Sequence, residues 1–507
     1  MAALKNNHFI FLNNRLGKNY TGIESSVLKR SKLFIEKLNI IPVFLTMAYD
    51  LNTESTVEGL KKLKKIPDSF KHINLYQFYQ TESVTKAISY PEPIENITKQ
   101  KLEIIQNEKK LLTKFYNLES GLISYIHYYD DNGEIYRLDN FDNKGFLSRV
   151  CVFNTTSRPR ERVSEFFYRV DGTLCFQKFY SHKNGENAVE RIMVTDNLGR
   201  PAKVFDKEDD FTKFLLEFYF NKYSKEDNVN VIVDRKVHLI YTMNNRVIPN
   251  LKIYPVIHNY HLQDPLNLLS RLRSYAYYLQ DIKNIDGLIT LTDQQRYDII
   301  ERFGEYNNTY CIPHTVNDFP EKVPFNSRIT NKVIAVGRYS PEKNHELMIR
   351  VFAKVVERLP SATLDIYGQG PLKSKLELLV KHLNMEDNIS INSFAKDIDT
   401  KFSEARLSLL TSEYEGFSLV IMESLASGCP VIANDIRYGP SSMIDDGENG
   451  YLIDKDDESA FVDKIVKVLK NEDLNAELSQ NAYESSQRFS GDNVAPLWQR
   501  FIEKITE

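Results

Sequence analysis

The chain has 507 residues and a mass of 59.0 kDa, so we expect two or three domains. Hydrophobic residues make up 42% and charged residues 26%, as in ordinary globular proteins, and the formal charge of −4 argues against dedicated nucleic-acid binding. The N-terminus lacks a signal-peptide pattern, and no apolar stretch reaches the roughly 18–20 residues that span a bilayer. These features predict a cytoplasmic protein, with contact at the inner face of the membrane left open.

The first part of the chain predicts a βαβ unit. Residues 8–12 and 41–45 are short apolar runs typical of strands, and residues 23–38 have helical spacing of apolar side chains. A loop with two glycines, Gly17 and Gly22, joins the first strand to the helix. Strand, loop, helix and strand at this scale build a parallel sheet.

The pattern changes from helical to alternating at about residues 121–205, where Asn, Asp and Gly recur between aromatic-rich runs. Asn and Asp tolerate left-handed backbone angles and Gly adopts them freely, so these clusters predict hairpin turns. The turns are expected at residues 131–133, 142–145, 171–172, 184–185 and 196–199. Buried strands return at 229–234 and 253–257, so the antiparallel meander is interpreted as an insertion.

From about residue 332 the sequence alternates strands and helices again. Continuous apolar runs predict parallel strands buried on both faces, at 333–336, 362–367, 389–391, 407–411 and 430–433. The tail, residues 492–507, has apolar side chains at helical spacing and holds the only Trp. The four scattered cysteines form no CxxC or Cys/His cluster, so reduced thiols are expected, with no metal site.

Residues 411–424 are the most informative stretch, because they follow a predicted strand and open a helix. Gly416 would let backbone approach a ligand closely, and the free N–H groups of Ser418 and Leu419 would suit a diphosphate. Glu415 and Glu423 could then accept hydroxyls from a hexose and a ribose. The alternative is a helix start with ordinary acidic residues nearby.

Further strand ends carry similar signals. Arg338 and Lys343 lie in the loop after residues 333–336, at the edge of the sheet where open α/β folds bind ligands. Two cations there would stabilise a departing diphosphate, although a basic pair in a loop is also typical of a solvated surface. Tyr367-Gly368 begins a second glycine-rich strand end.

In combination these residues resemble the retaining glycosyltransferases of family 4, which have the two-lobed GT-B fold. The matching patterns are Glu-x7-Glu at Glu415 and Glu423, Gly-Arg-x4-Lys ending at Lys343, and the Tyr-Gly-x-Gly strand end. The resemblance implies that Glu423 holds the ribose, Glu415 the sugar, and Arg338 and Lys343 the diphosphate. The other donor-site residues that it implies are Tyr367, Gly368, Ser393, Phe394, Gly416, Phe417, Ser418 and Leu419.

A narrower resemblance concerns residues 19–24, 256–261 and 436–440, which look like the bacterial wall teichoic acid α-glycosyltransferases and, more distantly, the transferases of serine-rich adhesins. In that subgroup the last histidine of Val-Ile-His-x-x-His lies beside the reacting sugar, so the resemblance makes His261 a catalytic residue. A hydrogen-bonded histidine at a strand end is the alternative. Gly22 would face the diphosphate, and Gly17 is a weaker match.

Asp397-Ile398-Asp399 is an Asp-x-Asp, a metal-binding signature in other glycosyltransferases, but here it is interpreted as helix capping. We therefore predict no metal and no cofactor besides the UDP-sugar substrate. Arg271 and Arg273 are expected to face the cleft, where a polyanionic acceptor would bind.

The resulting expectation is an α/β GT-B protein with two Rossmann-like lobes and an antiparallel β-rich insertion. The predicted parts are an acceptor lobe at 1–76 and 211–320, the insertion at 77–210, the UDP-sugar lobe at 321–485, and a returning helix at 486–507. The expected reaction transfers glucose or N-acetylglucosamine, with retention, from UDP to a polyol-phosphate teichoic acid. Addition of GlcNAc to Ser residues of an adhesin and a non-catalytic scaffold are the alternatives, and homo-oligomers through the insertion are expected.

Overall fold

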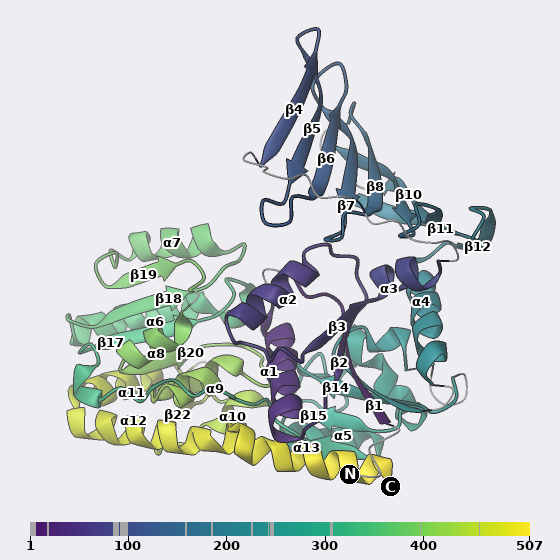
Figure 1. The fold of residues 1–507 in the computed structure, drawn as a ribbon. Coiled ribbons are helices and arrows are strands. Elements are labelled where there is room, and N and C mark those ends of the chain that lie inside the picture. The colour runs from purple at the N-terminus through teal and green to yellow at the C-terminus, as the bar shows by residue number, and fades with distance from the viewer. Residues whose placement is uncertain are drawn as a thin grey trace.

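The computed structural model describes residues 7–17, 20–84, 91, 100–157, 160–183, 186–224, 227–241, 243, 248–304, 308–395, 397–455 and 457–507. Within these ranges the chain forms three separate sheets. Figure 1 shows two α/β lobes side by side, with a sheet of long strands that projects from the N-terminal lobe. Among the described helices, none has the length and apolar character needed to cross a bilayer.

The N-terminal lobe is built on a parallel sheet of seven strands in the order β16-β15-β14-β13-β1-β2-β3. Its strands are β1 (Asn7–Asn13), β2 (Val43–Thr46), β3 (Lys71–Asn74), β13 (Asn228–Val233), β14 (Leu251–Ile257), β15 (Leu288–Thr290) and β16 (Thr309–Cys311). Its helices are α1 (Gly22–Lys37), α2 (Thr53–Lys62), α3 (Leu75–Glu82), α4 (Glu208–Tyr223), α5 (Asp293–Phe303) and the 3₁₀ segments η2 (Val237–Leu239) and η3 (Ser274–Asn284). The predicted βαβ unit is confirmed.

The C-terminal lobe has a parallel sheet of six strands in the order β19-β18-β17-β20-β21-β22. The strands are β17 (Lys332–Val336), β18 (Thr363–Tyr367), β19 (Ile389–Asn392), β20 (Leu407–Leu410), β21 (Val431–Asn434) and β22 (Gly450–Ile453). The helices are α6 (His345–Arg358), α7 (Lys373–His382), α8 (Ile398–Glu404), α9 (Leu419–Ala426), α10 (Gly439–Met443), α11 (Glu458–Lys470) and α12 (Glu472–Ser486), with 3₁₀ segments η4 (Phe325–Ser327), η5 (Pro341–Lys343) and η6 (Gln487–Phe489). All five predicted strands are present, and β22 is an addition to them.

The insertion is one antiparallel sheet of nine strands that pair in chain order from β4 to β12. The strands are β4 (Lys101–Gln106), β5 (Lys109–Tyr116), β6 (Ile123–Tyr129), β7 (Ile135–Phe141), β8 (Leu147–Asn154), β9 (Glu161–Tyr168), β10 (Leu174–Lys183), β11 (Glu186–Thr195) and β12 (Pro201–Phe205). Strands β9, β10 and β11 pack against helices α3 and α4 of the N-terminal lobe. Gly133, Gly145, Gly172 and Gly199 have φ between 76° and 86°, which confirms four of the predicted turns. The fifth, at 184–185, lies outside the described residues.

Two strands of this sheet, β4 and β5, lie before the region in which the sequence predicted a meander. Their turn is made by Asn107 and Glu108, whose φ angles are 50° and 62°. Left-handed angles at both positions are those of a two-residue hairpin turn, which usually contains glycine. The absence of glycine here explains why the hairpin was not predicted.

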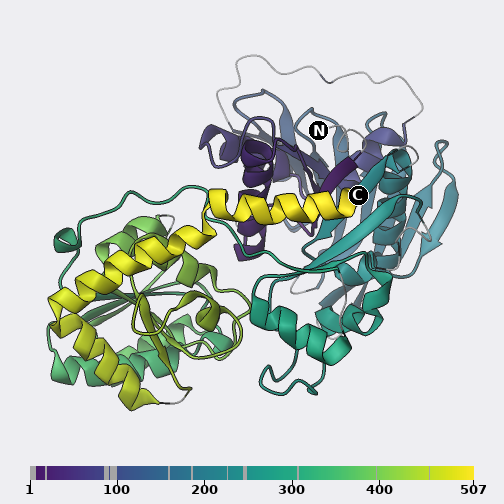
Figure 2. The same ribbon diagram turned by 90° about the horizontal axis from the view of Figure 1, so that it is seen from below.

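Helix α13 (Gly491–Thr506) leaves the C-terminal lobe and crosses back to the N-terminal lobe, as Figure 2 shows. Its apolar face is buried as its spacing predicts: Trp498 is 3% exposed, and its ring packs edge-on against Phe34 of α1 at 5.2 Å. Phe501 packs edge-on against Tyr254 at 5.1 Å. The helix therefore fixes one lobe to the other on the side away from the insertion.

Candidate functional site

When the strands of each lobe are numbered in chain order, both parallel sheets have the order 3-2-1-4-5-6. The N-terminal lobe adds a seventh strand, β16, at the edge. This order reverses beside the first strand of each lobe, and ligands of such sheets bind at the carboxyl ends of the strands near that reversal. Loops from these ends meet across the lobes. The ring of Tyr260, after β14, stacks on Tyr414, after β20, with centroids 4.9 Å apart.

The first turns of two helices, one from each lobe, meet at this position. A Cβ atom placed on Gly22, the first residue of α1, would lie 3.0 Å from Cδ1 of Leu419, the first residue of α9. Ser418 precedes α9 without capping it through its side chain, and the first turn of α9 has no acidic residue. Because backbone N–H groups at a helix start attract anions, this position suits a phosphate group.

Lys343 and Glu415 lie together beside this helix start. The Lys343 Nζ atom is 2.5 Å from Glu415 Oε1, and their side chains are only 16% and 11% exposed. The Ser412 hydroxyl donates to the same oxygen at 2.9 Å, and the Glu415 carbonyl accepts from the backbone N–H of Tyr438 at 2.8 Å. The pair is therefore held in a fixed position by the loops after β17, β20 and β21.

Arg338 has a different environment, although it belongs to the same loop as Lys343. Its guanidinium donates to Glu342 Oε1 at 2.8 Å, and its side chain is 75% exposed. Burial alone would raise the pKa of Glu342, but bonding from Ser340 and the charges of Arg338 and Lys343 hold that pKa below its ordinary value. The structure thus brings Lys343 to Glu415 and leaves Arg338 at the surface of the loop.

Glu423, on α9, reaches the opposite lobe, where its Oε1 accepts from Lys29 Nζ of α1 at 3.1 Å. Asp399 shares this environment, because burial and the charge of Glu423 raise the pKa of its carboxyl group. Asp397 precedes α8, but its side chain accepts from the Thr400 hydroxyl at 2.9 Å and makes no bond to the helix backbone. Asp397 thus occupies the N-cap position of α8, as predicted, without the hydrogen bond of a capping side chain. Asp399, in the first turn, lies near the candidate donor site.

His261 is fully buried, and neither of its ring nitrogens has a partner among the described residues. Its ring lies parallel to Tyr438 of the C-terminal lobe at 5.9 Å. Burial, with the nearby Arg302 charge, lowers its pKa to about 4, so the imidazole is neutral near pH 7. The catalytic role of His261 stays a prediction.

Three buried polar side chains, Arg30, Asp234 and His258, are hydrogen-bonded to one another next to the loop after β14. His258 Nε2 is 2.8 Å from Asp234 Oδ1, and the other Asp234 oxygen accepts from Arg30 at 2.5 Å. Burial opposes ionisation of Asp234, but the Arg30 guanidinium and His258 hold its pKa below the ordinary value. The His258 ring stacks on that of His314 at 5.3 Å.

Close packing against backbone atoms requires glycine at two of the predicted positions, Gly416 and Gly368. A Cβ on Gly416 would lie 2.3 Å from the His258 carbonyl oxygen of the other lobe, and one on Gly368 would lie 1.9 Å from that of Gly337. For Gly17 the nearest atom is Asp50 Oδ2, at 3.2 Å. A side chain at Gly416 would push the lobes apart, so this glycine allows the backbones of the two lobes to pack closely here.

The remaining predicted donor residues divide into exposed and packed groups. Phe394, after β19, is 67% exposed, and the neighbouring Ser393 hydroxyl accepts from Lys373 at 3.5 Å. Tyr367 is half-buried at the end of β18, whereas Phe417 is buried edge-on against His314 at 5.2 Å. An exposed Phe394 ring is available to cover a flat ligand such as a base.

The sequence analysis missed several residues of the cleft. Lys29 lies inside a helix and carries no motif, but Asp234 directly follows a buried strand and could have been singled out. Arg273, which was predicted at the cleft, donates to the Tyr260 hydroxyl at 2.6 Å, and Arg271 is exposed. No group of three or more metal-binding side chains occurs in the parts of the chain that the structure describes.

Two family models match the chain: "Glycosyl transferases group 1" at residues 320–485 and "Glycosyl transferase 1 domain A" at residues 10–194. The chain is 25% identical to a poly(glycerol-phosphate) alpha-glucosyltransferase of Bacillus subtilis, over 98% of this chain and 75% of the relative. It is 26% identical to a poly(ribitol-phosphate) alpha-N-acetylglucosaminyltransferase of Staphylococcus aureus, covering 95% and 97%.

A more distant relative is the GtfA subunit of a UDP-N-acetylglucosamine–peptide N-acetylglucosaminyltransferase of Streptococcus agalactiae, at 22% identity over 97% and 98% of the two chains. Among solved structures, TarM superposes with a TM-score of 0.80 at 24% identity, covering 98% of each chain. The superposition shows that the predicted two-lobed fold with its insertion is confirmed.

Proposed function

We propose that this chain, a glycosyltransferase of the GT-B fold with a group 1 domain in its C-terminal lobe, glycosylates a polyol-phosphate wall teichoic acid. The donor would be UDP-glucose or UDP-GlcNAc, with retention at the anomeric carbon. The observation that carries this proposal is the convergence of the α1 and α9 starts beside Lys343 and Glu415. The relatives whose names include polyol-phosphate acceptors support the choice of acceptor.

In this proposal the diphosphate lies at the start of α9, where backbone N–H groups and Lys343 offset its charge. Glu415 accepts a hydroxyl of the sugar, and Glu423 accepts the ribose after releasing Lys29. The acceptor hydroxyl attacks the anomeric carbon from the side of the leaving group. As the bond from that carbon to the phosphate oxygen breaks, the leaving phosphate takes the acceptor proton, and Arg338 moves from Glu342 toward the developing charge.

Metal independence is part of the proposal, because lysine and arginine supply the positive charge that a cation would supply elsewhere. Turnover should continue in EDTA at an unchanged rate. Activity that disappears in EDTA and returns with Mn²⁺ would contradict this.

The protein is also proposed to form homo-oligomers through the insertion and to act at the cytoplasmic face of the membrane. Apolar side chains on the edge strand β4 support the first point: Leu102 is 50% exposed and Ile105 is 60% exposed. Exposed apolar residues on an edge strand favour pairing with another chain. Equilibrium sedimentation of the full chain and of the Leu102→Lys/Ile105→Lys variant would test it.

The acceptor is tested by competition. The full chain is given one labelled UDP-sugar together with glycerol-phosphate or ribitol-phosphate polymer and a Ser-rich adhesin repeat, and the label is followed. The expected result is label on the polymer. NMR should show that the transferred sugar keeps the anomeric configuration it has in the UDP-sugar. Label on the protein repeat alone would favour the alternative acceptor, and no transfer from any donor would favour a scaffold.

A further inference from the structure

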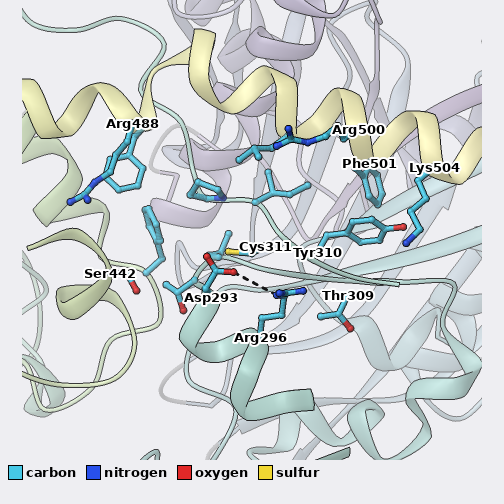
Figure 3. Close-up of a pocket in the computed structure, with 17 residues that line it drawn as sticks. Asp293, Arg296, Thr309, Tyr310, Cys311, Ser442, Arg488, Arg500, Phe501 and Lys504 are labelled. Carbon is cyan, nitrogen blue, oxygen red and sulfur yellow. Dashed lines mark ion pairs between the residues drawn. The ribbon is translucent and has the colours of Figure 1, made fainter. Parts of the chain in front are cut away.

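A cavity of about 720 Å³ lies between the lobes at the hinge, away from the Lys343–Glu415 pair. Both crossings of the chain between the lobes border it: Cys311, Ile312 and Pro313 lead out of the N-terminal lobe, and Arg488 and Phe489 lead back. Figure 3 shows α13 along one side of this space and α5 along the other. We name it the hinge groove.

The charge of the hinge groove is opposite to that of the whole chain. Four cationic side chains line it, against a single carboxylate, Asp293, which gives a formal excess of three positive charges (4 − 1) in a protein of net charge −4. The cations come from three segments of the chain: Arg296 from α5, Arg488 from η6, and Arg500 and Lys504 from α13. An excess gathered from several elements predicts an anionic ligand.

Internal pairing leaves the charge of Arg500 available. Arg296 lies 3.6 Å from Asp293, but its buried Nε has no hydrogen-bond partner among the described residues. Arg488 pairs with Asp445 at 3.1 Å. No ion pair is found for Arg500 within the described part of the chain. Lys504 has a partner of its own in the protein, and its ammonium lies 5.6 Å from the centroid of the Tyr310 ring.

The shape and walls indicate which anion would fit. Arg500 and Lys504 are four residues apart, so they lie on one face of α13 roughly 6 Å apart along its axis. Apolar side chains, among them Leu291, Ile312, Leu497 and Phe501, form the walls between the cations. Spaced charges with carbon-lined walls suit a linear chain in which phosphates alternate with polyol or sugar units.

We infer that the hinge groove binds a segment of a phosphodiester chain, as a second acceptor-binding site outside the site of transfer. This inference rests on the proposed function. Phe417 lines the groove and lies between Gly416 and Ser418 of the candidate donor loop, so a chain in the groove would pass beside that loop. Residues from both lobes would contact the same chain, which would favour long acceptors over single units.

The test is the variant Arg500→Glu/Lys504→Glu, with Arg350→Glu/Lys470→Glu as a matched control that reverses two exposed cations of the C-terminal lobe. Binding of a labelled long glycerol-phosphate oligomer is measured by fluorescence anisotropy, and KM is measured for that oligomer, for glycerol phosphate and for the UDP-sugar. The first variant should bind the oligomer about 10-fold more weakly at low salt, and the control should not. The KM for glycerol phosphate and for the donor should stay within twofold of wild type.

Equal oligomer binding by the wild type and the Arg500→Glu/Lys504→Glu variant would overturn the inference while leaving the proposed function intact. Failure of the wild type to glycosylate any polyol phosphate would instead overturn the proposed function. If the variant loses binding to anionic phospholipid vesicles but keeps oligomer binding, the groove is a lipid site and the inference is wrong. If charge reversal lowers the melting temperature, the neutral variant Arg500→Gln/Lys504→Gln is compared with the wild type for oligomer binding instead.

Discussion

The two lobes share one strand order but place their charged side chains differently at the carboxyl ends of the strands. In the N-terminal lobe, Arg30 and Asp234 form an ion pair whose side chains are 7% and 0% exposed, with His258 bonded to the same carboxylate. In the C-terminal lobe, Lys343 and Glu415 keep 16% and 11% exposure beside a helix start that is open to an anion. The first set is closed to solvent, and the second keeps some exposure beside the proposed diphosphate position.

If the buried set is structural, its loss should reduce stability most. Asp234→Ala should lower the free energy of unfolding by about 3–5 kcal/mol, because it leaves the Arg30 charge buried without a partner. Asp227→Ala, which removes the partially exposed His8–Asp227 pair of the same lobe, should cost less than about 1 kcal/mol. Urea unfolding measures both, and equal losses would contradict the distinction between the two pairs.

If the C-terminal set acts on the substrate, its loss should reduce turnover instead. Lys343→Ala should lower kcat by roughly 100-fold, the order expected when one fixed charge stabiliser is removed, and Arg338→Ala should have a similar effect. Lys354→Ala, which breaks an exposed pair with Glu458, is the control and should leave kcat unchanged. Release of UDP in steady state measures these rates, and normal kcat in Lys343→Ala would mean that the donor site lies elsewhere.

Glu423 links the two lobes, since it pairs with Lys29 of the N-terminal lobe and is the proposed ribose ligand. Glu423→Ala should weaken UDP binding about 10-fold with little change in kcat, because a ribose contact is similar in the ground and transition states. Lys29→Ala breaks the same contact between the lobes but retains the carboxylate. Calorimetric titration with UDP should show the loss only in Glu423→Ala; equal losses would mean that Glu423 acts through the lobe contact.

The smallest effect concerns His261, whose pKa falls from an ordinary 6.5 to about 4 on burial. Between these pH values the unfolded chain holds a proton on this ring and the folded chain does not, so stability decreases as the pH falls. His261→Gln removes this dependence and should make the slope shallower by up to about 1 kcal/mol per pH unit between pH 6 and pH 5. Thermal unfolding at several pH values measures it, and unchanged slopes would mean that the ring is accessible to protons in the fold.

Much of the architecture could be predicted from the sequence because it depends on local patterns. Apolar runs of three to six residues, helical spacing in residues 23–38 and 492–507, and Gly-containing turns located most of the elements. The Glu-x7-Glu spacing located the start of α9. The short strands β3, β15, β16 and β22 were not predicted. Strands β4 and β5 were not predicted, because the turn that joins them contains no glycine.

Contacts between the lobes were decided only by the tertiary structure. Lys29 and Glu423 are 394 positions apart, and the sequence around either residue contains no pattern that predicts contact with the other. The same holds for Gly416, whose close neighbour is the His258 backbone, and for the hinge groove, whose four cations come from three segments of the chain. Side-chain periodicity reports which face of an element is buried, whereas the partner across a cleft depends on how two folded lobes are oriented.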